Sequence, residues 1–272
     1  MAVRGVDISE HNGSVDFPAL KKAGVAFVIL RLGYGGDYAN QDDKRFAENI
    51  RKAEAAGLPW GAYLYSYAGT AAMAQSEAQH ALRLLEGKKP LYGVWFDVED
   101  AQIAQGDLIS TSRTFCDALE AAGLYTGIYA SVSWLTTKLD SPQLDRYDKW
   151  AAQWNSSCTY GKAYGIWQYT DKLVIGGKSF DGNYAYKDYP TIVQAMRQPE
   201  EKLMLTYEQW KGYLERYQKE QANKPISDWA QAAVDFVKAQ GYMSGDRDGK
   251  FRPQSPITRQ ELAAVLKNVL EQ

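Results

Sequence analysis

The 272-residue chain is poor in cysteine and histidine. It has two cysteines, Cys116 and Cys158, and two histidines, His11 and His80. Cys116 lies in an apolar helical pattern that predicts a small buried thiol, so we assign no disulfide. Zinc sites and histidine-based triads need imidazoles at converging positions. We therefore expect no metal and no cofactor, and carboxylates must carry any acid–base chemistry.

An excess of one charge and long apolar runs are also lacking. The 31 basic and 33 acidic side chains give a net charge of −2, which makes nucleic acid and anionic membranes unexpected partners. No run approaches membrane-spanning length, and the first residues lack the apolar stretch of a signal peptide. An enzyme acting outside the cell would need another route of release.

The first 130 residues repeat one pattern, in which a β-rich run is followed by an amphipathic helix and a glycine. The β-rich runs are 3–8, 25–31, 60–67, 91–98 and 125–130, and the glycines are Gly24, Gly57, Gly87 and Gly123. A glycine at these places suits the left-handed residue that ends a helix. The alternation predicts a parallel sheet.

After residue 130 the strand-like runs lie closer together. They are 150–154, 165–169 and 178–183, with too few residues between them for a helical crossover after each. Five βα-type strands and three further strands predict an α/β fold, an irregular (β/α)5(β)3 barrel similar to a TIM barrel. We place this domain at residues 1–192.

Residues 193–222 predict a helical linker. One helix face carries apolar residues at alternating steps of four and three: Leu203, Tyr207, Trp210, Leu214 and Tyr217. Thr206 and Gln209 predict a capping box. Two heptads are short for a coiled coil, so we favour a helix packed on a neighbouring domain over a self-associating one.

Residues 223–272 predict a small all-α module. Two helical patterns, 228–239 and 258–269, flank a stretch rich in glycine and aspartate. A second capping box begins at Thr258 and ends at Glu261. The module is therefore expected to be separate from the barrel.

Carboxylates end several predicted strands. Asp97 and Glu99 are two residues apart, so their side chains point to one face. Asp7 ends the first strand and Asp181 lies at the last, which would bring four acids to one barrel mouth. Each alone also fits a pairing, capping or turn role. Their joint placement favours an acid–base site.

Such a cluster suits glycoside hydrolysis. The reaction needs one carboxyl that protonates the leaving oxygen and another that stays ionised beside an oxocarbenium-like transition state. Crowding and burial raise at least one carboxyl pKa. Glu99 has the longer reach and is the expected proton donor.

Aromatic residues near these strand ends are candidate substrate-binding residues. Tyr63, Tyr65 and Tyr67 share one face of the third strand, as core or as the wall of a sugar-binding groove. We favour core for Tyr63 and groove for the other two. Trp167 and Tyr169 end the seventh strand, where a ring would stack on sugar or fill the barrel.

Six motifs occur in order over about residues 3–190. They are Gly-Val-Asp-Ile-Ser from Gly5, Gly-Ala-Tyr-Leu-Tyr from Gly61, Phe-Asp-Val-Glu from Phe96, Gly-Ile-Tyr-Ala-Ser from Gly127, Ile-Trp-Gln-Tyr from Ile166 and Phe-Asp-Gly-Asn from Phe180. Together they resemble glycoside hydrolase family 25, the lysozymes typified by bacteriophage and actinomycete muramidases.

The resemblance implies retaining cleavage of the β-1,4 bond between N-acetylmuramic acid and N-acetylglucosamine in peptidoglycan. By position, Glu99 matches the general acid and Asp97 the neighbouring carboxylate, while Asp7 and Asp181 match supporting acids. It leaves open whether the second step uses a carboxylate nucleophile or the acetamido group of the substrate.

The terminal module resembles an S-layer homology domain through Ile226-Ser-Asp-Trp-Ala, the segment 245–253 and Ile257-Thr-Arg-Gln-Glu. This implies binding to a secondary polysaccharide of the Gram-positive cell wall, with Trp229 stacking on sugar and Arg259 pairing with an acidic substituent. A helix-packing tryptophan and a surface arginine are the alternatives. Such domains generally work in threes, so this single copy either forms homo-oligomers through the linker helix and module or packs alone on the linker.

Two other functions are less well supported. A chitinase-like barrel usually has a further aspartate two residues before the catalytic pair, where this chain has Trp95. A non-catalytic wall carbohydrate-binding protein would not need all four acids. We expect an endolysin made in the host cytoplasm without a signal peptide, which acts on the cell wall after release, with an autolysin that has lost its leader as the competing origin.

Overall fold

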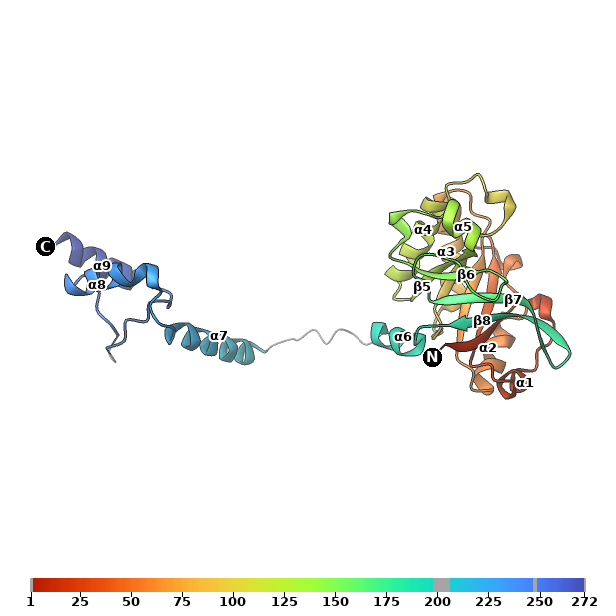
Figure 1. Cartoon of the computed structure of the whole chain (residues 1–272), viewed down its shortest axis with the longest axis horizontal. Coiled ribbons are helices and arrows are strands. Elements are labelled where there is room, and N and C mark those ends of the chain that lie inside the picture. Colours follow the sequence, from red (N-terminus) through yellow and green to blue (C-terminus); the bar gives the residue numbers. More distant parts are fainter. Residues whose placement is uncertain (1, 198–205, 247–248, 272) are drawn as a thin grey trace. The chain divides into compact units, whose positions relative to one another are not determined.

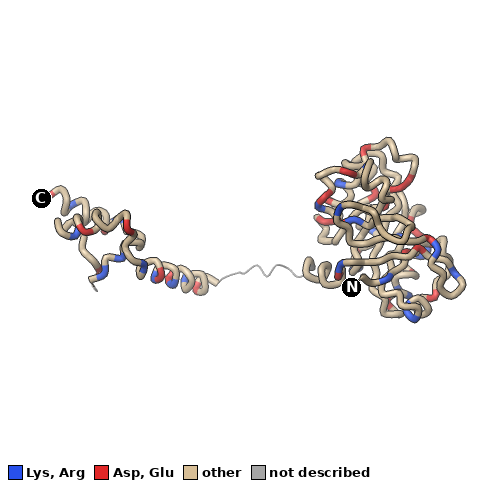
Figure 2. The backbone as a smooth tube through the Cα atoms, viewed as in Figure 1, with Lys and Arg blue, Asp and Glu red and all other residues tan. Residues whose placement is uncertain are grey.

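The computed structural model describes residues 2–197, 206–246 and 249–271. The chain divides into two compact units, Met1–Pro199 and Glu200–Gln272. Figure 1 shows strands with helices around them in the first unit and helices in the second. Figure 2 shows charges of both signs interspersed along both units. None of the described helices is long and apolar enough to span a membrane.

The first unit is a closed barrel whose strands follow one another in chain order. The strands are β1 (Val3–Ile8), β2 (Phe27–Tyr34), β3 (Trp60–Tyr65), β4 (Val94–Asp97), β5 (Thr126–Ser131), β6 (Asp148–Ala152), β7 (Ile166–Ile175) and β8 (Lys178–Ala185). β1 to β7 pair in parallel, whereas β8 runs antiparallel to both β7 and β1. The expected α/β barrel is confirmed.

One α-helix follows each of the first five strands. These are α1 (Phe17–Lys22), α2 (Phe46–Ala55), α3 (Ala71–Leu85), α4 (Leu108–Ala121) and α5 (Val132–Thr137). The predicted glycines Gly24, Gly57, Gly87 and Gly123 follow the first four helices, with φ between 64° and 84°. Residues with a Cβ rarely adopt this conformation, which explains why glycine stands at each place.

Large aromatic side chains fill the barrel interior. Trp95 and Trp150 are fully buried and meet edge to face, with ring centroids 5.9 Å apart. The Trp95 indole donates to the backbone oxygen of Tyr92 at 2.8 Å. Gly127 lies so close that a Cβ there would be 2.5 Å from the Trp95 ring. The interior is therefore a packed core and not a channel.

The last two strands form a hairpin longer than the sequence predicts. β7 continues to Ile175, although its apolar pattern ends near residue 169. The turn consists of Gly176 and Gly177, with φ of 59° and 78°. Two positive φ angles match the twist of a tight antiparallel hairpin. Hairpin pairing therefore extends β7 into a polar, partly exposed stretch.

The predicted domain boundary after residue 192 needs correction, because it falls inside α6 (Tyr189–Arg197). Tyr189 and Val193 are buried in the first unit. The Tyr189 hydroxyl donates to Asp148 at 2.7 Å. These contacts make α6 part of the barrel domain, and the division between the two units follows Pro199.

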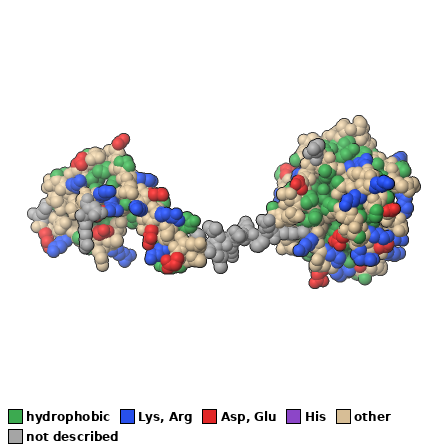
Figure 3. Space-filling view, turned by 90° about the horizontal axis from the view of Figure 1, so that it is seen from below, with side chains coloured by type: hydrophobic (Ala, Val, Ile, Leu, Met, Phe, Trp, Pro, Cys, Tyr) green, Lys and Arg blue, Asp and Glu red, His purple; other side chains and the backbone are tan. Residues whose placement is uncertain are grey.

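The second unit contains α7 (Tyr207–Ala222), α8 (Gln231–Ala239) and α9 (Arg259–Leu270). Both predicted capping boxes are present, Thr206 with Gln209 and Thr258 with Glu261. Residues 198–205 of the predicted linker, which include Leu203, lie outside the described residues. The rest of the predicted apolar face is exposed: Tyr207, Trp210, Leu214 and Tyr217. Figure 3 shows apolar side chains at the surface among charges of both signs.

Candidate active site

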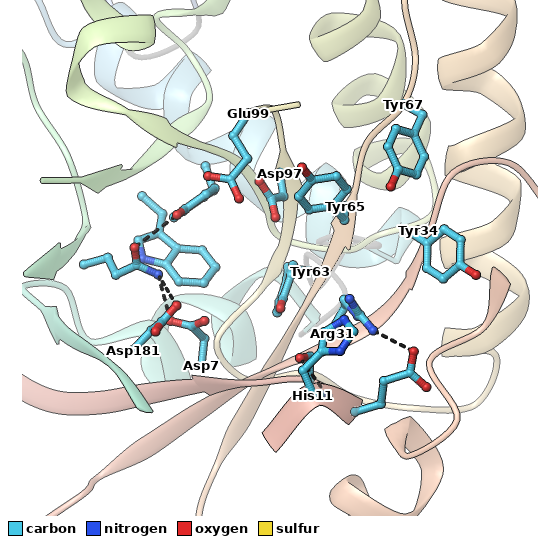
Figure 4. Close-up of a pocket in the computed structure, with 15 residues that line it drawn as sticks. Asp7, His11, Arg31, Tyr34, Tyr63, Tyr65, Tyr67, Asp97, Glu99 and Asp181 are labelled. Atoms are coloured by element: carbon cyan, nitrogen blue, oxygen red, sulfur yellow. Dashed lines mark hydrogen bonds and ion pairs between the residues drawn. The ribbon is translucent and has the colours of Figure 1, made fainter. Parts of the chain in front are cut away.

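A cavity of about 570 Å³ lies at the carboxyl ends of the parallel strands and brings the predicted acids together (Figure 4). Its lining includes all four: Asp7, Asp97, Glu99 and Asp181. In Figure 4 they form two groups, with Asp97 beside Glu99 and Asp7 beside Asp181. The predicted convergence of the four acids is therefore present in the structure, although Asp181 lies in the middle of β8 and not at its end.

Amide groups hold the second group of acids. Asp7 and Asp181 are register partners on the antiparallel strands β1 and β8. Asn183 Nδ2 donates to Asp7 at 2.8 Å, and Gln168 Nε2 donates to Asp7 at 3.1 Å and to Asp181 at 3.4 Å. Such donors stabilise ionised carboxylates and fix their direction.

Burial and mutual repulsion disfavour full ionisation of the four acids. Burial raises the pKa of Asp7 well above its ordinary value, and the charge of Asp181 raises it further. The pKa of Asp97 is raised by burial and then by Glu99 and Asp7. Burial also raises the pKa of Glu99, and it raises the pKa of Asp181 to about 6. The cluster therefore retains protons closer to neutral pH than separate carboxyls would.

Asp97 has a buried oxygen without a hydrogen-bond donor in the described part of the chain. The side chain is 3% exposed, and Oδ1 accepts no hydrogen bond from the described part of the chain. A buried unpaired acceptor costs about 1–3 kcal/mol. Asp97 as a residue lines the cavity, so its carboxyl group is placed beside a bound substrate.

Gln168 and Tyr129 also line the cavity, although neither was predicted from the sequence as a site residue. Gln168 Oε1 accepts from Tyr129 Oη at 3.0 Å and from Trp154 Nε1 at 3.1 Å. Since Trp154 can satisfy that oxygen, the single hydroxyl hydrogen of Tyr129 can be given to Glu99 instead. That hydrogen bond opposes the rise in the pKa of Glu99 caused by burial. Tyr129 thus connects the two groups of acids.

Trp167 and Tyr169 do not line this cavity. Trp167 is 7% exposed, and its indole donates to the backbone oxygen of Gln153 at 2.8 Å. Tyr169 stacks on Tyr184, with ring centroids 4.6 Å apart. Alternation along β7 directs Gln168 into the cavity and its two neighbours to the opposite face. The structure therefore differs from the expectation that these two rings meet substrate here.

Tyr63, Tyr65 and Tyr67 do share the cavity wall. Tyr63 also packs edge to face with Trp150, at 6.0 Å between centroids, so it contributes to the core as well. The Tyr65 hydroxyl donates to Asp100 at 3.1 Å. Tyr67 is 36% exposed, which leaves part of its ring open to a ligand.

Arg31 is a buried cation that was not predicted from the sequence as a site residue. Figure 4 shows it beside Tyr63. Arg31 is 9% exposed and pairs with Asp43 at 2.9 Å and Glu10 at 3.0 Å. Its charge opposes the rise in the pKa of Asp97. The available sequence signal was an arginine at the end of the predicted β-rich run 25–31.

The second unit has a cavity of its own, of about 540 Å³, between α9 and residues 242–246 and 250–257. Trp229 and Arg259 do not line it, and the Trp229 side chain is 87% exposed. Both predicted polysaccharide-binding residues are therefore exposed and outside this cavity. Across the described ranges of the chain, no group of three or more His, Cys, Asp or Glu residues is arranged to hold a metal ion.

Comparison with known proteins decides the family of the barrel. Residues 6–178 match the family described as Glycosyl hydrolases family 25, over more than half of the chain. The chain belongs to glycoside hydrolase family 25. Residues 224–263 match the S-layer homology domain.

Relatives of this family 25 chain include the autolytic lysozyme of Clostridium acetobutylicum, which is 31% identical over 179 residues. The match covers 65% of this chain and 53% of that lysozyme, so the chain spans about half of its length. Among solved structures, the catalytic domain of an endolysin from a Listeria monocytogenes bacteriophage has a TM-score of 0.61 and 25% identity, covering 71% of this chain and 98% of that one. The modular autolysin LytC from Streptococcus pneumoniae, solved with a synthetic peptidoglycan ligand, has a TM-score of 0.61 and 26% identity, covering 68% and 47%.

Proposed function

We propose that the barrel is an N-acetylmuramidase. It hydrolyses the β-1,4 bond between N-acetylmuramic acid and N-acetylglucosamine in peptidoglycan and retains the anomeric configuration. The observation that carries this proposal is the convergence of four carboxyls in one strand-end cavity, with pKa values raised by burial. Membership of family 25 and similarity to an autolytic lysozyme support the choice of substrate.

Glu99 is the proposed general acid. Burial keeps its carboxyl protonated to higher pH than an exposed glutamate, so it can give its proton to the leaving oxygen as the glycosidic bond breaks. In the second step the resulting carboxylate takes a proton from the attacking water. Glu99 thereby returns to its starting state.

Asp97 is proposed to stabilise the charge that develops at the anomeric carbon. Its carboxylate, which lies at the cavity wall, either bonds to that carbon or accepts the N–H of the acetamido group while the acetamido oxygen attacks. Both routes give two displacements and therefore retention. Asp7 and Asp181, fixed by Gln168 and Asn183, add negative charge that favours the cationic transition state.

We propose that the second unit holds the enzyme on the cell wall by binding a secondary wall polysaccharide. The match to an S-layer homology domain and the exposure of Trp229 support this role. Trp229 stacks on a sugar and Arg259 pairs with an acidic substituent. The exposed apolar face of α7 suits association of chains into a homo-oligomer. The enzyme acts on the wall after release from the cell that makes it.

The enzymatic proposal is tested by digesting purified peptidoglycan, reducing the products with borohydride and analysing the new ends by mass spectrometry. Reduced muramic acid ends are expected. Reduced glucosamine ends would indicate cleavage of a different bond. If neither kind of reduced end forms, the protein is non-catalytic. Proton NMR of the first product anomer checks retention, and chitin is the control for a chitinase-like activity.

The binding proposal is tested by sedimenting the full chain with walls before and after extraction of their secondary polysaccharide. We expect binding only before extraction, and loss of binding in Trp229→Ala and Arg259→Ala.

The proposed homo-oligomer is tested by light scattering during size exclusion, which measures the oligomeric state of the chain. A Trp210→Lys variant is expected to contain a smaller share of oligomer than the wild type. A wild type that is monomeric at all concentrations would contradict the proposed oligomer.

A further inference from the structure

Glu77 of α3 is a buried carboxyl that the proposed chemistry does not use. Glu77 is only 1% exposed. It forms no ion pair with any residue in the described ranges. Its carboxyl oxygens instead accept hydrogen bonds from the segment between β3 and α3.

Glu77 accepts hydrogen bonds from two consecutive residues, and one of these in turn binds the third. One carboxyl oxygen accepts from the backbone N–H of Tyr67 at 2.8 Å, and the other accepts from Ser66 Oγ at 2.7 Å. Ser66 Oγ in turn accepts from the N–H of Ala68 at 3.0 Å. Ser66 and Ala68 are fully buried. Glu77 therefore fixes this segment at both of its carboxyl oxygens.

The middle residue of that segment supplies an aromatic wall of the cavity. The Tyr67 ring meets Tyr65 at 5.4 Å and Tyr34 at 6.2 Å between centroids, in both cases edge to face. Figure 4 shows the Tyr67 side chain beside these two rings. Its backbone is anchored by Glu77 while part of its ring remains open. A shift of the anchor would move the ring relative to the acids.

We infer that Glu77 is a positioning residue for glycan binding, which fixes the Tyr67 ring at the cavity wall through the Tyr67 N–H and Ser66. The inference rests on the proposed function, because the wall is useful only if a sugar packs against it. It concerns binding and not the bond-breaking step, since Glu77 itself does not line the cavity.

The anchor does not require a negative charge. A neutral carboxyl still has an oxygen that accepts the Tyr67 N–H, and its O–H can donate to Ser66 Oγ. Burial raises the pKa of Glu77 to about 7, with the hydrogen bonds from Ser66 and Tyr67 opposing the rise. Glutamine has the same shape, one acceptor oxygen and one donor group, so it can replace both interactions.

The test is a double-mutant cycle in the full chain with Glu77→Ala, Tyr67→Ala and the double variant, assayed on soluble glycan fragments. The effects of substituting residues in one hydrogen-bond network are coupled and do not add independently. We expect Glu77→Ala to raise KM about tenfold with kcat nearly unchanged, and to add little in the Tyr67→Ala background. Glu77→Gln should stay close to the wild-type KM.

A second readout does not depend on catalysis. Hydrogen exchange at the Tyr67 amide should be at least about tenfold faster in Glu77→Ala than in the wild type, and nearly unchanged in Glu77→Gln. Ser66→Ala, which removes one of the two links, replaces Glu77→Ala if that variant does not fold. It should show the same direction of change in KM and exchange.

The inference would be overturned if the effects of Glu77→Ala and Tyr67→Ala on KM multiply in the double variant. It would also be overturned if hydrogen exchange at the Tyr67 amide is the same in Glu77→Ala as in the wild type. A fall in kcat alone would also contradict it. If the wild type releases no muramic acid ends, the proposed function fails. In that case the exchange measurement and glycan binding by fluorescence still decide whether Glu77 positions Tyr67.

Discussion

The buried carboxyl of Glu77 predicts a specific loss of stability as the pH rises. Its pKa in the folded chain is about 7, compared with an ordinary value of 4.5. Below the ordinary value both folded and unfolded chains hold the proton, so the group contributes no difference. Between these two values the unfolded chain releases the proton while the folded chain keeps it, and the free energy of unfolding decreases.

The size of this loss follows from the interval between the two pKa values. An interval from 4.5 to about 7 corresponds to about 3 kcal/mol, fully expressed above the higher value. Glu77→Gln keeps the shape of the side chain but cannot ionise. The variant should therefore gain stability relative to the wild type as the pH rises, and the gain should level off above neutral pH.

The assay is urea unfolding of both proteins, followed by tryptophan fluorescence at several values from about pH 4.5 to about pH 8. Other ionisable groups are shared, so their contributions cancel in the difference between the two proteins. A difference that stays flat over this interval would refute the reasoning. It would show that the carboxyl remains solvated enough to ionise at its ordinary pKa.

Three further predictions follow from the packing and the hydrogen bonds. Gln168→Leu removes an amide donor to Asp7, which should raise the pKa of Asp7 further and move the acidic limb of the pH profile of kcat/KM to higher pH. Gly127→Ala places a Cβ 2.5 Å from the Trp95 ring and should destabilise the barrel by about 1–3 kcal/mol in thermal unfolding. Thr258→Ala removes the capping box of α9 and should destabilise the second unit by about 1 kcal/mol, without changing the rate on soluble fragments.

The βα alternation and the strand-end acids could be predicted because both follow from local rules. The spacing of apolar residues along the sequence distinguishes the strands from the helices. Gly24 and Gly123 mark helix ends through their positive φ. Asp97 and Glu99 share a face because strand side chains alternate. The parallel order of the strands then brings acids distant in sequence to one end of the barrel.

Features that depend on contacts between distant segments could not be read in this way. The choice of Gln168 over Trp167 for the cavity depends on the orientation of β7 between its neighbours. Arg31 becomes a site residue through Glu10 and Asp43, which lie in other segments. The role of Glu77 depends on a helix residue meeting the loop ten residues before it. Apolar periodicity also could not show that α6 packs on the barrel.

The central claim is that Glu99 gives the proton to the leaving oxygen. The most direct test compares Glu99→Gln with the wild type on peptidoglycan fragments and on an aryl glycoside of the same sugar whose dinitrophenolate leaving group needs no proton. The account predicts a loss of about 10²–10⁴-fold on the fragments and a much smaller loss on the aryl glycoside. Equal losses on both substrates, or full activity on the fragments, would contradict it.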